Sequence, residues 1–265
     1  VFRKETLYQK MRALIIYLVI SAVFIGCTPI LSIDASTQSV YHFSDTDKNI
    51  SLLDISETFG TYDGSFVLYD NNLDSWKIYD LEEATKRIPP ESTYKIYDAL
   101  LGLESGIITP EHSSMTWNGD AFPFPSWEAD QDLNSAMQNS VNWYFQAIDS
   151  QLGINRVQEF LNKIEYGNQT TSSNLDLYWS DFSLKISPLE QVTLLKKFNT
   201  NEFHLNSQNV FSVKNAIKIA STPNGNFYGK TGTGRVNGQD INGWFIGYVE
   251  TSDNSYYFAT NIQSD

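Results

Sequence analysis

The stretch FYGKTGTGRVNGQDINGWFIGYVE, residues 227–250, decides the fold class. Residues Phe227–Val236 predict a strand that ends at an Asn-Gly pair, which favours the tight turn of a β-hairpin. A second strand is predicted over Gly243–Glu250, and a polar turn leads to a third over Tyr256–Ile262. This part of the chain therefore predicts an antiparallel meander.

Strands are also predicted ahead of a helical middle. Residues Gly64–Asp70 and Ser75–Tyr79 flank the turn residues Asn71-Asn72 and predict a hairpin. Helical patterns follow, for example over Ser135–Leu152 and Pro188–Phe198. Strands on both sides of a helical middle predict an α+β fold, in which helices and a mostly helical subdomain flank one antiparallel sheet.

An uncharged run covers residues 13–33 and is long enough to cross a bilayer as a helix. Basic residues precede this run, and Asp34 is the first charge after it. The positive-inside rule then places residues 1–12 in the cytoplasm and the rest of the chain outside the cell membrane. We therefore predict a single transmembrane helix, an extracellular tether over residues 34–50 and a globular domain over 51–265.

Two other interpretations of residues 13–33 stay open. A signal peptide could begin at Met11, and Phe24–Cys27 resembles a lipoprotein cleavage box. A buried core helix is the other alternative. The chain begins with Val1, so we expect it to be a fragment of a longer protein, with residues 1–12 as a cytoplasmic remnant.

Charge and composition exclude several classes of function. The net charge of −13 argues against a nucleic-acid partner, because an acidic surface repels phosphates. The single cysteine, Cys27, rules out an intramolecular disulfide. The three histidines, His42, His112 and His204, are scattered, so the sequence predicts neither a metal site nor a Ser-His-Asp triad.

The segment Ser92-Thr93-Tyr94-Lys95 carries the residues of a nucleophile and its base. It follows Pro89-Pro90 and precedes an apolar helical pattern, so Ser92 and Lys95 are predicted to face the same way across the first turn of a helix. A neutral lysine within hydrogen-bond reach can take the proton of a serine hydroxyl, and burial can make the lysine neutral. The N–H groups at the helix start suit an oxyanion.

A second motif, Lys230-Thr231-Gly232-Thr233, lies on a predicted strand whose edge can bind a substrate amide. A third, Ser140-Val141-Asn142, lies between the other two along the chain. Taken singly, these motifs are equally compatible with a helix start, an exposed turn and a helical surface triplet. Their order along one chain is what argues for a shared active site.

The three motifs in this order resemble those of the penicillin-recognising serine acyltransferases, the penicillin-binding proteins and serine β-lactamases. The segments 166–168 (YGN), 178–179 (YW) and 244–247 (WFIG) are similar to class D β-lactamases. The resemblance covers residues 51–265 and implies the serine β-lactamase/penicillin-binding fold. It also implies roles for ten residues. The nucleophile would be Ser92, the base Lys95, the proton relay Ser140, the substrate-binding residues Asn142, Lys230, Thr231, Gly232 and Thr233, and the supporting residues Trp179 and Tyr166.

Within class D, segments 92–97, 138–145 and 242–249 resemble the sensor domains of penicillin-responsive transducers of Gram-positive bacteria, of the BlaR and MecR type. This resemblance implies a membrane-anchored β-lactam receptor that keeps the antibiotic as a long-lived acyl-serine and triggers resistance signalling. It also implies a cytoplasmic zinc protease domain in the full-length protein. Residues 1–265 contain no His-Glu-x-x-His motif, so that domain is not in this sequence.

The class D resemblance further implies a CO2-derived carbamate on Lys95 and no other cofactor. Hydrolases of this class usually have an apolar residue where this chain has Asn142, whose amide would favour loss of CO2 after acylation. A secreted or lipid-anchored class D β-lactamase that hydrolyses penicillins is the main alternative. Asn142 and the residues before Met11 argue against it. A cell-wall peptidase acting on D-Ala-D-Ala peptides is less compatible with the class D segments.

Overall fold

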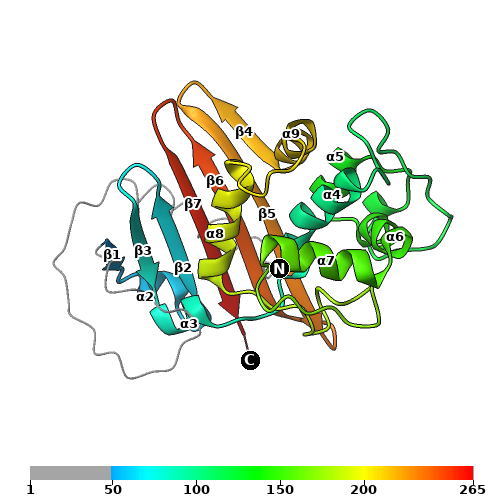
Figure 1. Cartoon of the computed structure of the whole chain (residues 1–265). Helices are drawn as coiled ribbons and strands as arrows, with labels where there is room; N and C mark the ends of the chain where they lie inside the picture. Colours follow the sequence, from blue (N-terminus) through cyan, green and yellow to red (C-terminus); the bar gives the residue numbers. More distant parts are fainter. Residues whose placement is uncertain (1–48, 265) are drawn as a thin grey trace.

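The computed structural model describes residues 49–264, and one seven-stranded sheet runs through them (Figure 1). The strand order is β1-β3-β2-β7-β6-β5-β4. The strands are β1 (Ile50–Leu52), β2 (Asp63–Asp70), β3 (Ser75–Tyr79), β4 (Lys218–Thr222), β5 (Gly225–Val236), β6 (Gln239–Glu250) and β7 (Ser255–Gln263). Both predicted hairpin regions are confirmed, and β2 pairs with β7, so the sheet joins the two ends of the domain as predicted.

The prediction of an antiparallel sheet needs one correction, because β1 pairs with β3 in parallel. The chain leaves β1, passes through the short helix α2 (Ser56–Phe59) and returns in the opposite direction as β2. The hairpin then reverses the direction once more, so β3 runs the same way as β1. All other strand pairs in the described residues are antiparallel.

The helices pack on the sheet and beside it, with α8 against the sheet and the α4–α7 group beyond β5 (Figure 1). Besides α2 they are α3 (Leu81–Thr85), α4 (Lys95–Glu104), α5 (Leu133–Gln138), α6 (Asn142–Leu152), α7 (Ile154–Ile164), α8 (Pro188–Asn199) and α9 (Ser207–Ala216), with 3-10 turns η1 (Glu91–Tyr94) and η2 (Pro125–Trp127). The predicted helix over Pro188–Phe198 is confirmed as α8, which begins with a capping box between Ser187 and Glu190.

Alternating side chains of the sheet pack into two hydrophobic cores, one on each face. On β2, Val67 and Tyr69 join the large core beneath the helices, whereas Phe66 and Leu68 join a smaller core on the opposite face. Phe59 of α2 belongs to the smaller core. This period of two is what a sheet covered on both faces requires.

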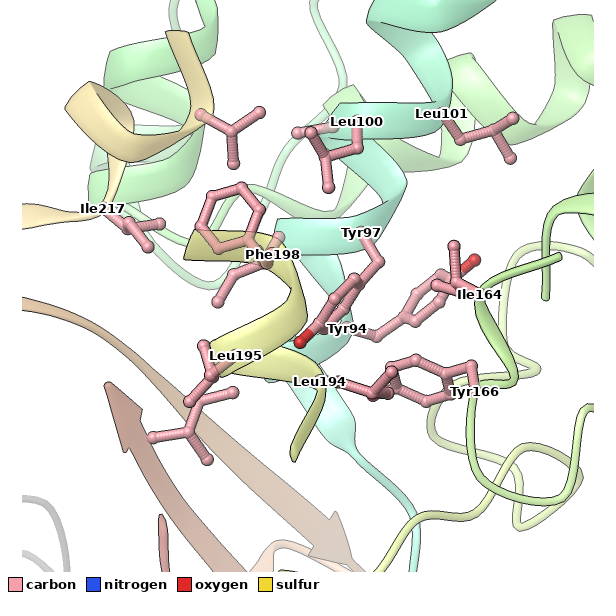
Figure 2. Close-up of a cluster of buried hydrophobic side chains, with 14 of the residues drawn as sticks. Tyr94, Tyr97, Leu100, Leu101, Ile164, Tyr166, Leu194, Leu195, Phe198 and Ile217 are labelled. Carbon is pink, nitrogen blue, oxygen red and sulfur yellow. The ribbon is translucent and has the colours of Figure 1, made fainter. Parts of the chain in front are cut away.

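Tyrosine rings occupy the part of the large core nearest the start of α4. Tyr94 and Tyr97 pack edge-on against Tyr166, with ring centroids 5.2 and 5.1 Å apart. Figure 2 shows these rings together with Leu194 and Phe198 of α8. This packing fixes the first turn of α4 against α8 and the segment after α7.

The predicted helix over Ser135–Leu152 is wrong in one respect, because it is two helices that break at Ser140. Ser140 has a left-handed backbone (φ +55°), and the Val141 N–H donates to the Ala136 carbonyl at 2.9 Å. The Ser140 N–H donates to the Met137 carbonyl at 3.3 Å. These two bonds form a Schellman ending to α5, and the chain then starts α6 at Asn142 in a new direction.

The predicted transmembrane helix over residues 13–33, the remnant 1–12 and most of the tether 34–50 lie outside the described residues. Between residues 49 and 264, no helix has the length and apolar character needed to cross a membrane.

Candidate active site

Ser92 and Lys95 face each other across the first turn that leads into α4. The sequence predicts a helix start here, and the structure has the 3-10 turn η1 followed by α4. The Pro90 carbonyl accepts hydrogen bonds from the Thr93 N–H (3.2 Å) and the Thr93 hydroxyl (2.6 Å), which closes the turn. Lys95 Nζ consequently lies 2.7 Å from Ser92 Oγ.

The break between α5 and α6 brings the second motif to the same point. Lys95 Nζ donates to Asn142 Oδ1 at 2.6 Å and lies 3.5 Å from Ser140 Oγ. The left-handed Ser140 and the first residue of α6 thereby present a hydroxyl and an amide to one amine. A continuous helix would have pointed these two side chains in directions about 200° apart, at 100° per residue.

The third motif reaches the site from β5. Lys230 Nζ donates to Ser140 Oγ at 2.9 Å, so Ser140 lies between the two lysines. Within the described part of the chain, β4 lies beyond β5 but pairs with it only from Gly225 to Tyr228. The strand edge from Lys230 onward is therefore open to an extended ligand, as the sequence predicts.

Gly232 lets the turn that carries the nucleophile rest on β5. A Cβ atom at Gly232 would lie 3.0 Å from the Pro90 carbonyl oxygen and 3.2 Å from Ser92 N. The side chain of Thr231 is half-buried and that of Thr233 is exposed on either side of this contact. Ser92 N–H and the backbone around Thr233 are in this way brought to the same end of the site.

Burial controls the charge of both lysines. Lys95 is fully buried, and desolvation, followed by the charge of Lys230, holds its pKa well below the usual value. Burial lowers the pKa of Lys230 to about 7. Among residues 49–264, neither lysine has an ion pair with a carboxylate. Lys95 can therefore exist as the neutral amine that a base must be.

The two supporting residues lie in the wall of the site and at its base. Trp179 is buried and stacks on Tyr94, and its carbonyl accepts the Glu91 N–H at 3.0 Å. Its ring centroid is 6.0 Å from Lys95 Nζ. Tyr166 packs beneath the turn, against Tyr94, and holds it from below.

Several residues around the site are not apparent from the sequence. Phe145 places its ring centroid 5.7 Å from Lys95 Nζ and supplies an apolar wall. Trp244 and Asn242 donate to the Pro89 carbonyl at 2.8 and 3.0 Å and tie the pre-serine segment to β6. Glu91 is buried directly before the nucleophile. The only sequence signal for Glu91 is its position next to Ser92.

Known proteins share this architecture and sequence. The family model of the penicillin binding protein transpeptidase domain matches residues 60–265. The chain belongs to this family. Regulatory protein BlaR1 of Bacillus licheniformis is 45% identical over 255 residues, which are 96% of this chain and 42% of that protein. The chain thus spans less than half the length of this relative.

Solved structures that resemble this chain support the same fold and family. The C-terminal domain of the Bacillus licheniformis BlaR penicillin-receptor matches with a TM-score of 0.79 and 47% identity, over 81% of this chain and 88% of that one. The class D β-lactamase BAT-2 matches with a TM-score of 0.76 and 35% identity, over 80% and 89%. The predicted fold and the predicted resemblance to class D-like sensor domains are confirmed.

Proposed function

We propose that this chain is the sensor part of a membrane-anchored β-lactam receptor, in which the antibiotic acylates Ser92 and stays bound. The observation that carries the proposal is the 2.6 Å contact between Lys95 Nζ and Asn142 Oδ1. It places a polar amide on the amine that lies 2.7 Å from Ser92 Oγ and would serve as its base. The similarity to BlaR1 supports a receptor in preference to a hydrolase.

Acylation follows from the geometry. Ser92 Oγ attacks the β-lactam carbonyl carbon and its proton passes to Lys95, 2.7 Å away. The oxygen that becomes negative is stabilised by the N–H groups of Ser92 and Thr233. When the ring C–N bond breaks, the nitrogen takes a proton through Ser140, which lies between Lys95 and Lys230.

The same residues hold the antibiotic. Lys230 and Thr231 bind its carboxylate, and the open edge of β5 at Thr233 binds its side-chain amide. Gly232 keeps the strand close to the nucleophile. The product is an ester between Ser92 and the opened antibiotic.

The surroundings of Lys95 fit a carbamate before the antibiotic arrives. A buried neutral amine reacts with CO2, and Phe145 and Trp179 give that amine an apolar wall. Such a carbamate would supply a carboxylate-like oxygen as the base. Asn142 Oδ1 accepts an N–H of the free amine and thereby favours it over the carboxylated form. Without the carbamate to activate water, the ester persists.

The transducer resemblance extends the proposal to the whole protein. We infer that residues 13–33 cross the cell membrane, that the described domain is extracellular, and that acylation is relayed to a cytoplasmic zinc protease domain of the full-length chain. The 45% identity to BlaR1 over 255 residues supports this organisation.

The first test is intact-mass spectrometry of residues 34–265 mixed with stoichiometric benzylpenicillin in bicarbonate buffer and followed for hours. We expect one equivalent of adduct on Ser92, absent in Ser92→Ala, that outlasts a bacterial generation. Rapid loss of the adduct with release of several equivalents of penicilloate would instead assign a class D hydrolase, as the 35% identity to BAT-2 allows. No adduct at all would contradict both functions.

A further inference from the structure

Glu91 is a buried titratable group next to the nucleophile that this acylation mechanism leaves unused. It directly precedes the nucleophile, is 6% exposed and has a left-handed backbone with φ +52°. A residue other than glycine adopts this conformation at an energetic cost, so the surrounding structure must hold it there. Its N–H donates to the Trp179 carbonyl at 3.0 Å, which supplies one of the restraints.

The side chain of Glu91 supplies another restraint, because it runs along β5. A Cβ atom at Gly232 would lie 3.1 Å from Glu91 Cβ, and one at Gly234 would lie 2.5 Å from Glu91 Oε1. Asn242 Nδ2 of β6 lies 3.5 Å from the same oxygen and 3.0 Å from the Pro89 carbonyl. The carboxyl group thus joins the nucleophile's turn to the two strands beside it.

Among the described residues that line the cavity at Glu91, no cation is free to pair with its carboxyl group. It lines a cavity of about 440 Å³ together with Lys86, Arg235 and Asp63. Lys86 pairs with Glu83 and Arg235 pairs with Asp240, so both cations are already compensated. The other elements at the cavity contribute uncharged residues, namely Ser180, Phe182, Ile241, Asn242, Gln263 and Ser264.

Burial therefore dominates the protonation of Glu91. It raises the pKa to about 8, although the hydrogen bond from Asn242 and the charge of Lys95 lower it. At neutral pH the group is mostly an uncharged carboxylic acid. Lys95 of α4 is the active-site group whose charge, when it is protonated, acts on Glu91, and the charge of Lys230 of β5 acts in turn on Lys95.

We propose that Glu91 is a positioning residue that must carry its proton for Ser92 to be acylated efficiently. The inference rests on the proposed acylation of Ser92. The neutral acid holds the turn against β5 at Gly232, where Ser92 N also packs. An ionised Glu91 would place a negative charge beside the N–H groups that stabilise the oxyanion. It would also favour the charged form of Lys95, which cannot act as a base.

The test measures the second-order rate constant of benzylpenicillin acylation from pH 6 to 10 for wild type, Glu91→Gln and Lys86→Gln. Glutamine keeps the shape and the uncharged state of protonated Glu91. We express the rate constant of Glu91→Gln as a ratio to that of wild type and set this ratio to one at pH 7. If a group with a pKa near 8 must stay protonated in wild type, the ratio should rise to about tenfold at pH 9. The titration of Lys230 occurs in both proteins and cancels in this ratio, whereas any change that Glu91 makes to the titration of Lys95 is part of the effect being measured. Lys86→Gln, which lines the same cavity, should keep the wild-type profile.

Gly234→Ala provides a second test that leaves Glu91 in place. The added methyl group overlaps the end of the flexible Glu91 side chain, so the carboxyl group must move, and the methyl group also lies 3.1 Å from Asn242 Cβ, which must give way slightly. We expect acylation at pH 7 to fall severalfold with an unchanged circular dichroism spectrum. The inference about Glu91 would be overturned by a Glu91→Gln pH profile within twofold of wild type from pH 6 to 10, or by a Gly234→Ala rate equal to wild type. Either result would leave the proposed function standing. A wild type that forms no adduct at any pH would overturn the proposed function with it.

Discussion

Asn142 determines which form of Lys95 is favoured once Ser92 is acylated. Its Oδ1 atom lies 2.6 Å from Lys95 Nζ, in a site otherwise walled by Phe145 and Trp179. Replacement by valine removes the acceptor and completes the apolar wall. The carbamate should then survive acylation and act as a base toward water.

Asn142→Val is therefore expected to shorten the lifetime of the acyl-serine by roughly 10²-fold, the lower end of what a general base contributes. Intact-mass decay curves in bicarbonate buffer measure this directly. Gln151→Ala, on the same helix but hydrogen-bonded only to Ala147 among described residues, is the matched control and should decay like wild type. An unchanged acyl-serine lifetime in Asn142→Val would mean that the Asn142 amide is not the reason why the ester persists.

At the residue scale, the sequence is informative where spacing alone carries the chemistry. Ser92 and Lys95 are three residues apart, so any helical turn brings them together. Ser140 and Lys230 can be grouped with them only through motif order, and the structure places them within 2.9 Å of each other. The role of Glu91 depends on burial by β5 and β6, which no local pattern encodes.

At the scale of elements, the contact between α4 and α6 contains two buried carboxyl groups, Asp98 and Asp149. The Tyr178 hydroxyl donates to Asp149 at 3.4 Å. Burial raises the pKa of both groups, with mutual repulsion adding to the effect on Asp98, and brings Asp149 to about 8. Neither Asp98 oxygen has a hydrogen-bond partner among the described residues, so we expect the pair to hold a proton between its two carboxyl groups at neutral pH.

This pair makes the stability of the domain fall as pH rises. Between about pH 4 and 8 the folded state keeps a proton that the unfolded state releases, so unfolding becomes easier with increasing pH. Asp98→Asn supplies a permanent N–H donor to Asp149 and removes the loss of stability that the Asp98–Asp149 pair causes at high pH. We expect it to raise the free energy of unfolding by about 1–3 kcal/mol at pH 9, and by less at pH 5.

Thermal unfolding from pH 5 to 9 measures the effect. Glu91 titrates in the same range but is present in both proteins. Glu159→Gln, an exposed carboxylate on the neighbouring helix α7, should change stability little at any pH. A destabilised Asp98→Asn at pH 9 would mean that the two carboxyl groups do not share a proton.

Elements with local turn chemistry could be predicted, and those set by distant contacts could not. The Asn237-Gly238 pair, for example, predicts the turn of the β5–β6 hairpin. The end of α5 carries Ser140 where a glycine would have signalled a left-handed cap, so the periodic pattern continues across a real break. The parallel pairing of β1 depends on the free edge of β3, whose paired residues lie 26 positions further along the chain, as in Ile50 with Trp76.

At the scale of the whole molecule, the net charge of −13 opposes the approach of an anionic antibiotic. Lys230, which receives its carboxylate, is buried, so it acts only at short range. Raising the ionic strength from 0.01 to 1 M shortens the Debye length from about 30 to about 3 Å and screens the long-range repulsion. The acylation rate constant of benzylpenicillin should therefore increase severalfold with salt.

Stopped-flow measurements at several salt concentrations would establish this dependence. A zwitterionic penicillin, which has no net charge, serves as the control and should respond much less. A benzylpenicillin rate that falls with salt would indicate that the local lysines outweigh the overall charge.

The order of the strands also places the first strand of the domain, β1, at a definite distance from the active site. The chain enters at β1, and five strand-to-strand steps lead from there to β5, where the antibiotic would be held. At about 4.8 Å a step, some 24 Å of hydrogen-bonded sheet lies between them. A dye on the exposed Leu52 position and a fluorescent penicillin on Ser92 would thus form an energy-transfer pair, and unlabelled β-lactams would be detected by the loss of transfer when they compete for Ser92.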